Sequence, residues 1–175
     1  MFATIYLPNF YLQAALRHRS ELCAKPVALI DDKDKKAVIN QLNKAAEAAG
    51  VHKGMTPSQG LARCLSLIIK TRARSQEKLI DEILLHYEFT LAPYVEATAP
   101  GVCTIQFTDN RNLGPKLSRV IEQLPECEIS AQAGIAPTPD ASLLVAHLAR
   151  PVLQIEDAKQ FLAPLPIETL RYNRG

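Results

Sequence analysis

The sequence predicts an α/β (α+β) fold in which an antiparallel or mixed sheet carries helices on one face. The chain has 175 residues, of which 47% are hydrophobic, so it can bury a substantial core. Short β-rich segments alternate with segments whose apolar residues recur at helical spacing. Outside residues 20–74, predicted strands and helices follow one another along the chain, with two helices between the first strand and the next. This order fits a ferredoxin-like sheet, and 20–74 would be a small insert.

The first part of the chain is predicted from its strand and helix signals in order. Phe2–Leu7 is a β-rich apolar strand, Pro8 breaks it, and Asn9 is suited to cap the helix that follows at 10–19. The insert is expected to hold two strands joined by a polar turn, two short helices and a final strand. Their predicted ranges are 26–31, 37–40, 44–49, 57–64 and 65–70, with Gly50 ending the first helix and Thr56 capping the second.

The second part of the chain contains the longest predicted helix, at 75–91, where one apolar stripe recurs at helical spacing. Alternating and apolar segments then predict two strands and two helices, followed by a short strand or turn and a short helix. Their ranges are 102–107, 112–124, 128–135, 139–148, 151–154 and 156–162.

The net charge of +2 conceals an asymmetry between the two parts of the chain. Residues 1–74 hold 12 Lys+Arg and 5 Asp+Glu, a balance of +7, and residues 75–175 hold 8 and 13, a balance of −5. A basic part suggests a polyanion as its partner, although solvated surfaces of both signs would give the same counts.

Cysteine and histidine spacing argues against a metal centre. The four cysteines are widely spaced, with no CxxC pair, and the histidines form neither HxxxH nor HExxH. Free or buried thiols in a reducing cytosol are the expected state, and we predict no bound metal or cofactor. The apolar runs are too short to span a bilayer, so no membrane association is expected.

Five segments in order along the chain carry a resemblance to a known family. They are TIYLPNFYLQAAL from Thr4, ELCAKPVALI from Glu21, AAEAAGVHKGMTPSQGLARC from Ala45, YVEATAPGVCTIQFT from Tyr94 and AGIAPTPDASLLVAHLARP from Ala133. Together they resemble the Y-family DNA polymerases, the translesion enzymes, over nearly the whole chain. The resemblance implies a palm at 1–13 and 75–165, a fingers insert at 14–74, and the start of a thumb at 166–175.

The metal-binding carboxylates of that family are absent from the matching positions. Tyr6 and Pro8 stand in place of the two aspartates of the first motif, and Gly101 and Val102 in place of a later Asp-Glu pair. Nucleotide transfer in the family needs two divalent cations clamped by carboxylates. The resemblance therefore predicts that no catalytic residue is retained.

The residues that bind the triphosphate in that family are also replaced at the matching positions. Lys44 and Glu47 fall on the tyrosine and arginine of its YEAR motif, and Leu143 falls near its later lysine. The aromatic pair Phe10 and Tyr11 is kept, with Tyr11 at the position of the steric gate against a ribose 2′-OH. We expect Tyr11 to pack the vacated nucleotide pocket.

This pattern is similar to the ImuB-type branch, polymerase-like proteins without catalytic carboxylates. That resemblance implies an adaptor in bacterial damage-induced mutagenesis, cytoplasmic and associated with the nucleoid. Its implied partners are damaged or primed DNA, the sliding clamp, an ImuA-like RecA-type protein and an error-prone polymerase. The cations expected to contact DNA are Lys35, Lys36, Lys44, Lys53, Arg63, Arg72 and Arg74.

Two other functions remain open at this point. The first is an active translesion polymerase that binds Mg²⁺ through relocated carboxylates, for which Glu96 and Asp109 are the nearest acids in sequence. The second is a ferredoxin-like interaction module unrelated to DNA.

Overall fold

The computed structural model describes residues 1–33, 37–92 and 94–166. It divides into two compact units: unit 1 is Met1–Pro8 with Ile80–Gly175, and unit 2 is Asn9–Leu79. The palm and fingers boundaries at 13/14 and 74/75 stay predictions, and the helix after the first strand lies in unit 2. The expected thumb segment, apart from Pro166, lies outside the described residues.

Unit 1 is built on a five-stranded sheet with the order β5-β6-β1-β7-β8. Its central strand β1 pairs antiparallel with both β6 and β7, whereas β8 is parallel to β7. The sheet is therefore mixed, as predicted. The strand bounds are β1 Phe2–Tyr6, β5 Val95–Ala99, β6 Val102–Gln106, β7 Gln132–Ala136 and β8 Val152–Gln154.

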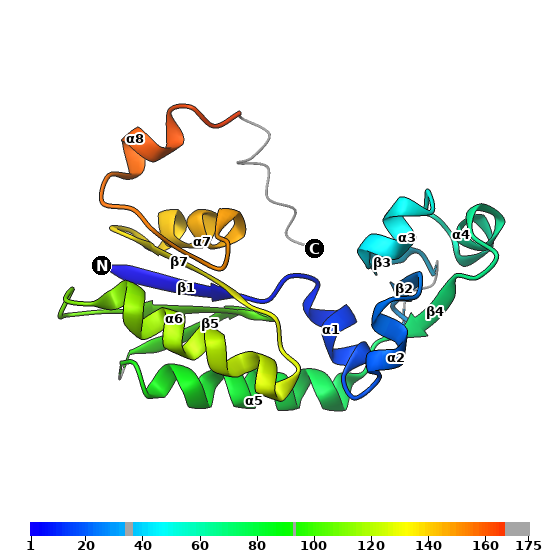
Figure 1. Cartoon of the computed structure of the whole chain (residues 1–175), viewed down its shortest axis with the longest axis horizontal. Helices are drawn as coiled ribbons and strands as arrows, with labels where there is room; N and C mark the ends of the chain where they lie inside the picture. The colour runs from blue at the N-terminus through cyan, green and yellow to red at the C-terminus, as the bar shows by residue number, and fades with distance from the viewer. Residues whose placement is uncertain (34–36, 93, 167–175) are drawn as a thin grey trace. The chain divides into compact units, whose positions relative to one another are not determined.

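Helices cover both faces of this sheet, which corrects the prediction of helices on one face. In Figure 1, α7 lies on one side of the sheet and α6 on the other. Thr4 points toward α7, where its hydroxyl is 2.7 Å from that of Ser142. The helices of unit 1 are α6 Leu113–Gln123, the 3₁₀ turn η1 Leu124–Cys127, α7 Pro139–Leu148 and α8 Ala158–Leu162, while α5 Arg74–Phe89 begins in unit 2 and continues into unit 1 from Ile80.

Both faces of the sheet are covered because the central strand β1 is buried on both of its sides. Ala3, Thr4 and Ile5 are consecutive, so their side chains alternate between the two faces, and all three are fully buried. A strand buried on both faces needs a cover on each side.

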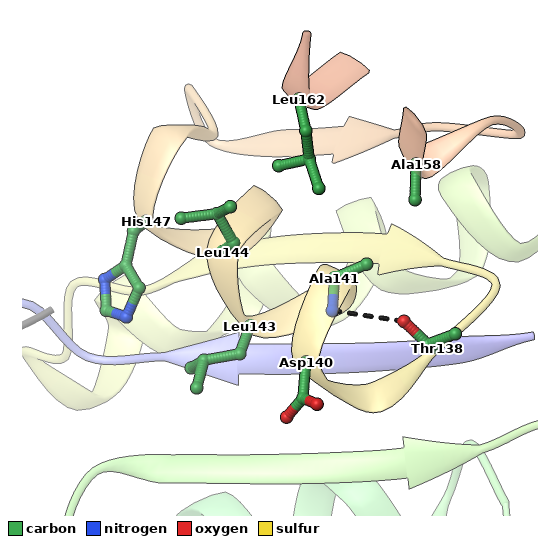
Figure 2. A pocket seen from close by; sticks show the side chains of 8 residues that line it. All are labelled: Thr138, Asp140, Ala141, Leu143, Leu144, His147, Ala158 and Leu162. Atoms are coloured by element: carbon green, nitrogen blue, oxygen red, sulfur yellow. Dashed lines mark hydrogen bonds between the residues drawn. The ribbon is translucent and has the colours of Figure 1, made fainter. Parts of the chain in front are cut away.

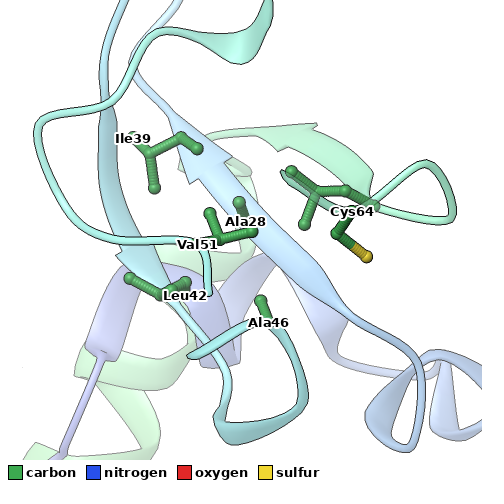
Figure 3. Close-up of a cluster of buried hydrophobic side chains, with 7 residues drawn as sticks. Ala28, Ile39, Leu42, Ala46, Val51 and Cys64 are labelled. Carbon is green, nitrogen blue, oxygen red and sulfur yellow. The ribbon is translucent and has the colours of Figure 1, made fainter. Parts of the chain in front are cut away.

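Unit 2 holds a three-stranded sheet with the order β3-β2-β4. β2 pairs antiparallel with β3, as predicted for the polar turn between them, and parallel with β4. A buried cluster covers one face of this sheet (Figure 3). The bounds are α1 Phe10–Leu16, α2 Ser20–Cys23, β2 Val27–Ile30, β3 Ile39–Leu42, α3 Lys44–Ala48, α4 Pro57–Arg63 and β4 Ile68–Thr71.

The ends of the helices in unit 2 largely follow the predicted capping residues. Thr56 and Gln59 form a reciprocal capping box at α4, and Gly50 follows α3 with a φ of 82°. Asn9 differs from the prediction because it adopts a left-handed conformation and makes no capping bond. Its side-chain amide donates instead to the carbonyl of Leu42, at 3.5 Å.

Candidate nucleotide-transfer site

The two strands that would carry the metal-binding carboxylates lie side by side in unit 1. Tyr6, at the end of β1, pairs directly with Val102, at the start of β6. Just beyond this pair, the backbone N–H of Leu7 donates to the carbonyl of Gly101 at 2.9 Å. The backbone thus brings both degenerate motifs together, and Pro8 follows one residue later at a partly buried position.

The side chains at this place supply no carboxylate. The ring of Tyr6 meets the imidazole of His147 from α7 edge-on, with centroids 3.9 Å apart and planes at 66°. Burial lowers the pKa of His147 to about 4, so the imidazole is neutral at physiological pH. Val102 and Gly101 are buried and offer no oxygen ligand from a side chain. Mg²⁺ is bound in proteins through carboxylates and other oxygen ligands.

The acids nearest to these positions in sequence are exposed. Among the described residues, no group of three or more His, Cys, Asp or Glu side chains is placed to hold a metal ion. Asp109 is exposed and forms an ion pair with Arg111 at 3.0 Å. Hydrogen bonds from Arg111 hold the pKa of Asp109 below its usual value. Glu96 is exposed on β5.

An apolar cavity of about 340 Å³ borders α7 in unit 1. Figure 2 shows Leu143 and His147 on α7, with Leu162 of α8 facing the helix. Leu143, predicted near the triphosphate-binding lysine, therefore lines an apolar surface. His147 was not among the predicted site residues, because its contact with Tyr6 depends on how α7 packs across the sheet. The cavity is lined by Thr138, Asp140, Ala141, Leu143, Leu144, His147, Ala158 and Leu162.

In unit 2, the ring face of Tyr11 is covered by a guanidinium group. The Cζ of Arg72 lies 3.8 Å from the ring centroid, a cation–π contact. Phe10 is buried and packs edge-on against the same ring, with centroids 5.3 Å apart. A ring held in this way presents little free surface to a nucleotide sugar.

Arg72 itself is fixed by two carboxylates. Its guanidinium contacts Glu77 at 2.6 Å and Asp31 at 3.0 Å, and Arg74 contacts Asp31 at 2.9 Å. The pKa of Asp31 is lowered first by the backbone N–H of Lys33 and then by the two arginines. Hydrogen bonding to Glu77 raises the pKa of Arg72 further. Arg72 and Arg74 therefore belong to an ion-pair network.

The remaining predicted cations of unit 2 are differently placed. Lys44 begins α3 and is exposed, as is Glu47 one turn later, while Asn43 caps this helix by accepting from Ala46 N–H at 3.0 Å. Lys53 and Arg63 are also exposed. Lys35 and Lys36 lie outside the described residues.

Comparison with known proteins places the chain in a family. The impB/mucB/samB family (IMS) matches residues 5–147. The chain belongs to this family. The predicted resemblance to Y-family polymerases is thereby confirmed at family level. The match covers both strand ends of the degenerate site and most of α7.

The chain is also similar in sequence to proteins named DNA polymerase IV. The chain is 24% identical over 170 residues to DNA polymerase IV of Ralstonia nicotianae and 26% identical over 175 residues to DNA polymerase IV of Glaesserella parasuis. Each match covers 92% of this chain and 48% of the relative. The chain thus spans about half the length of the curated relatives it matches.

The fold is similar to that of DinB from Sulfolobus solfataricus, with a TM-score of 0.82 and 16% identity over 96% of this chain and 52% of that one. A Y-family DNA polymerase chimera of Dbh and Dpo4 gives a TM-score of 0.82 at 17% identity, over 96% of this chain and 53% of that one. The predicted fold class is confirmed. Within the described ranges, no helix is long and apolar enough to cross a membrane.

Proposed function

We propose that this chain is the polymerase-like part of a catalytically inactive translesion protein that acts as an adaptor and DNA-binding component in DNA repair. The observation that carries the proposal is the pairing of Tyr6 with Val102. These are the two paired positions at which the resemblance places carboxylates, and their side chains are a phenol and an isopropyl group. Without carboxylates, two cations cannot be held against a triphosphate, and the main electrostatic stabilisation of phosphoryl transfer is lost.

The surroundings of Tyr11 support the same proposal from the other unit. In an active enzyme, the aromatic ring at this position must stay open to the sugar of the incoming nucleotide. Here the Arg72 guanidinium covers the ring and is itself held by Glu77 and Asp31. A nucleotide would have to displace a partly buried ion-pair network to reach that face of the ring.

The partners in this proposal follow the ImuB-type resemblance. They are primed or damaged DNA, the sliding clamp, an ImuA-like RecA-type protein and an error-prone polymerase, at the bacterial nucleoid in the cytoplasm. No cofactor is required for this role. The positive balance of residues 1–74 supports the DNA contact, because Lys and Arg bind phosphates without regard to sequence.

The full-length protein is expected to show no primer extension with Mg²⁺ or Mn²⁺. The reason is that residues 6, 8, 101 and 102 supply no carboxylate to either cation. The measurement is gel-resolved extension of a labelled primer on undamaged and lesion-bearing templates. DNA polymerase IV of Ralstonia nicotianae, assayed in parallel, provides the positive control. Template-dependent incorporation by this protein at a rate comparable to the control would refute the proposal.

DNA affinity of the full-length protein is expected to depend on Lys53 and Arg63. Each is an exposed cation of unit 2, so Lys53→Glu and Arg63→Glu should each leave one DNA phosphate without its cation. The slope of log K against log salt should then become shallower by about 0.9 for each such phosphate on duplex DNA. Fluorescence anisotropy with labelled duplex at several salt concentrations measures both affinity and slope.

The matched control for this series is Lys116→Glu, which makes the same charge change at an exposed position on α6 of unit 1. It should leave the slope unchanged. If all three variants lowered the slope equally, DNA binding would reflect the net charge of the protein and not a property of unit 2.

A further inference from the structure

The outer edge of β5 is an open backbone surface in unit 1. β5 is the terminal strand of the sheet and, among the described strands, pairs with β6 alone (Figure 1). Glu96, Ala97, Thr98 and Ala99 are all exposed. Tyr94, directly before the strand, is 65% exposed. An edge strand of this kind offers free N–H and C=O groups to another chain.

The pairing with β6 identifies which backbone groups point outward. The N–H of Gln106 donates to the carbonyl of Tyr94, so Tyr94 and then Glu96 direct their backbone groups toward β6. In an antiparallel pair this direction alternates from one residue to the next. Val95 and Ala97 therefore direct their backbone N–H and C=O groups away from the sheet. A register shift between Ala97 and Ala99 ends the regular edge.

The charge on the strand excludes a second copy of this chain as the natural occupant. If Val95 of one copy paired with Ala97 of the other, the two Glu96 side chains would lie directly opposite each other. Like charges in that position destabilise a strand pair. A register shifted toward the end of the strand meets the irregularity between Ala97 and Ala99. Glu96 thus favours a partner that places a cation opposite it.

We propose that the outer edge of β5 binds an extended basic segment of another protein by strand addition, with Lys or Arg opposite Glu96. Backbone hydrogen bonds to Val95 and Ala97 supply the pairing, and Glu96 selects the charge. The balance of −5 in residues 75–175 favours the same partner chemistry. This surface provides the adaptor proposed above with a docking site, but it is independent of the loss of catalysis.

The test uses the full-length protein and two labelled peptides, one alternating valine with lysine and one alternating valine with glutamate. Saturable binding of the lysine peptide is expected by fluorescence anisotropy. Glu96→Lys should weaken it about tenfold and favour the glutamate peptide, because the cross-strand charge pair is reversed. Ala97→Pro should also weaken it, because proline removes an outward N–H without removing a bond to β6.

Glu122→Lys on α6 is the matched control, since it makes the same charge change at another exposed position of unit 1. It should leave peptide preference unchanged. Equal effects of Glu96→Lys and Glu122→Lys would show general electrostatic attraction and overturn the proposal. So would the absence of saturable binding, or a dimer of the unmodified protein that Ala97→Pro dissociates. None of these outcomes bears on primer extension.

Discussion

Replacing Gly134 by alanine is expected to destabilise unit 1 severely. Gly134 lies at the centre of β7, where α7 crosses the sheet. A Cβ at this position would lie 2.7 Å from the carbonyl carbon of Val145, and closer still to the backbone nitrogen of Ala146 and the carbonyl oxygen of Ser142. These are helix backbone atoms, so no rotamer change can relieve the overlap.

The cost of this substitution follows from what must move. Overpacking a core with movable side chains costs about 1–3 kcal/mol. Here the whole of α7 must shift from the sheet, so we expect a loss of about 3 kcal/mol or more in the free energy of unfolding. That is a large share of the stability of an ordinary domain, about 5–15 kcal/mol. The Thr4–Ser142 hydrogen bond would be disrupted by the same shift.

Urea unfolding followed by circular dichroism measures the effect, with Gly60→Ala in unit 2 as the control. The Cβ of alanine at position 60 would meet side-chain atoms, the ends of Leu67 and Ile39 at 2.8 and 2.9 Å and Val51 Cγ1 at 3.6 Å. Those ends can rotate away, and alanine favours the α4 helix by about 1 kcal/mol over glycine. A small change is therefore expected at Gly60. A Gly134→Ala protein as stable as the unmodified chain would show that α7 is not held against β7 in this way.

Most of the fold can be predicted because local signals and tertiary packing agree. The spacing of apolar residues in α6 and the capping residue Thr56 both act within a few positions of the chain. The second face of the unit 1 sheet was missed because an apolar strand shows burial but does not show how many layers cover it.

The errors in the strands have a common physical cause. β5 is not visible in the sequence because Glu96 to Ala99 are exposed and weakly apolar, and the strand exists through its pairing with β6. The apolar run from Leu65 led to the opposite error, because a strand was predicted to begin at a residue that lies outside any strand. Leu65 is 92% exposed, and β4 begins only at Ile68. Strand formation depends on partners that are distant in sequence, so local composition is a weak guide to it.

Part of the candidate site could be predicted from the sequence. The resemblance located Tyr6 and Val102, and their pairing in the sheet agrees with a shared site. The Arg72–Tyr11 contact was not predicted, because it joins α1 to the residue just after β4. Arg72 was instead expected to contact DNA, since sequence alone shows its charge but not the carboxylates that surround it.

Glu88 is expected to make the stability of the protein fall as pH rises. This residue of α5 is fully buried, and within the described part of the chain neither carboxyl oxygen has a hydrogen-bond partner of good geometry. Burial raises the pKa of Glu88 to about 8, although the thiol of Cys103 partly opposes the shift. The pKa of Cys103 is itself raised by burial and by the nearby Glu88 carboxyl.

The direction of the pH dependence follows from the protonation states. The pKa of this group is about 4.5 in the unfolded chain and about 8 in the folded protein. Between these two pKa values, the folded protein keeps a proton that the unfolded chain has lost. The stabilisation present below pH 4.5 is therefore lost progressively as pH rises to 8. At 1.36 kcal/mol per pKa unit, the loss is on the order of 4 kcal/mol.

Glu88→Gln tests this expectation because a glutamine amide has the shape of the protonated acid and cannot ionise. The free energy of unfolding, measured in urea between pH 5 and pH 8.5, should be similar for both proteins at pH 5. At pH 8.5 the variant should be more stable by a few kcal/mol. Glu82→Gln, at an exposed position of the same helix, is the control and should follow the unmodified protein. If Glu88→Gln also followed it at every pH, the Glu88 carboxyl would have to be solvated in the folded protein, and α5 would not pack over Cys103.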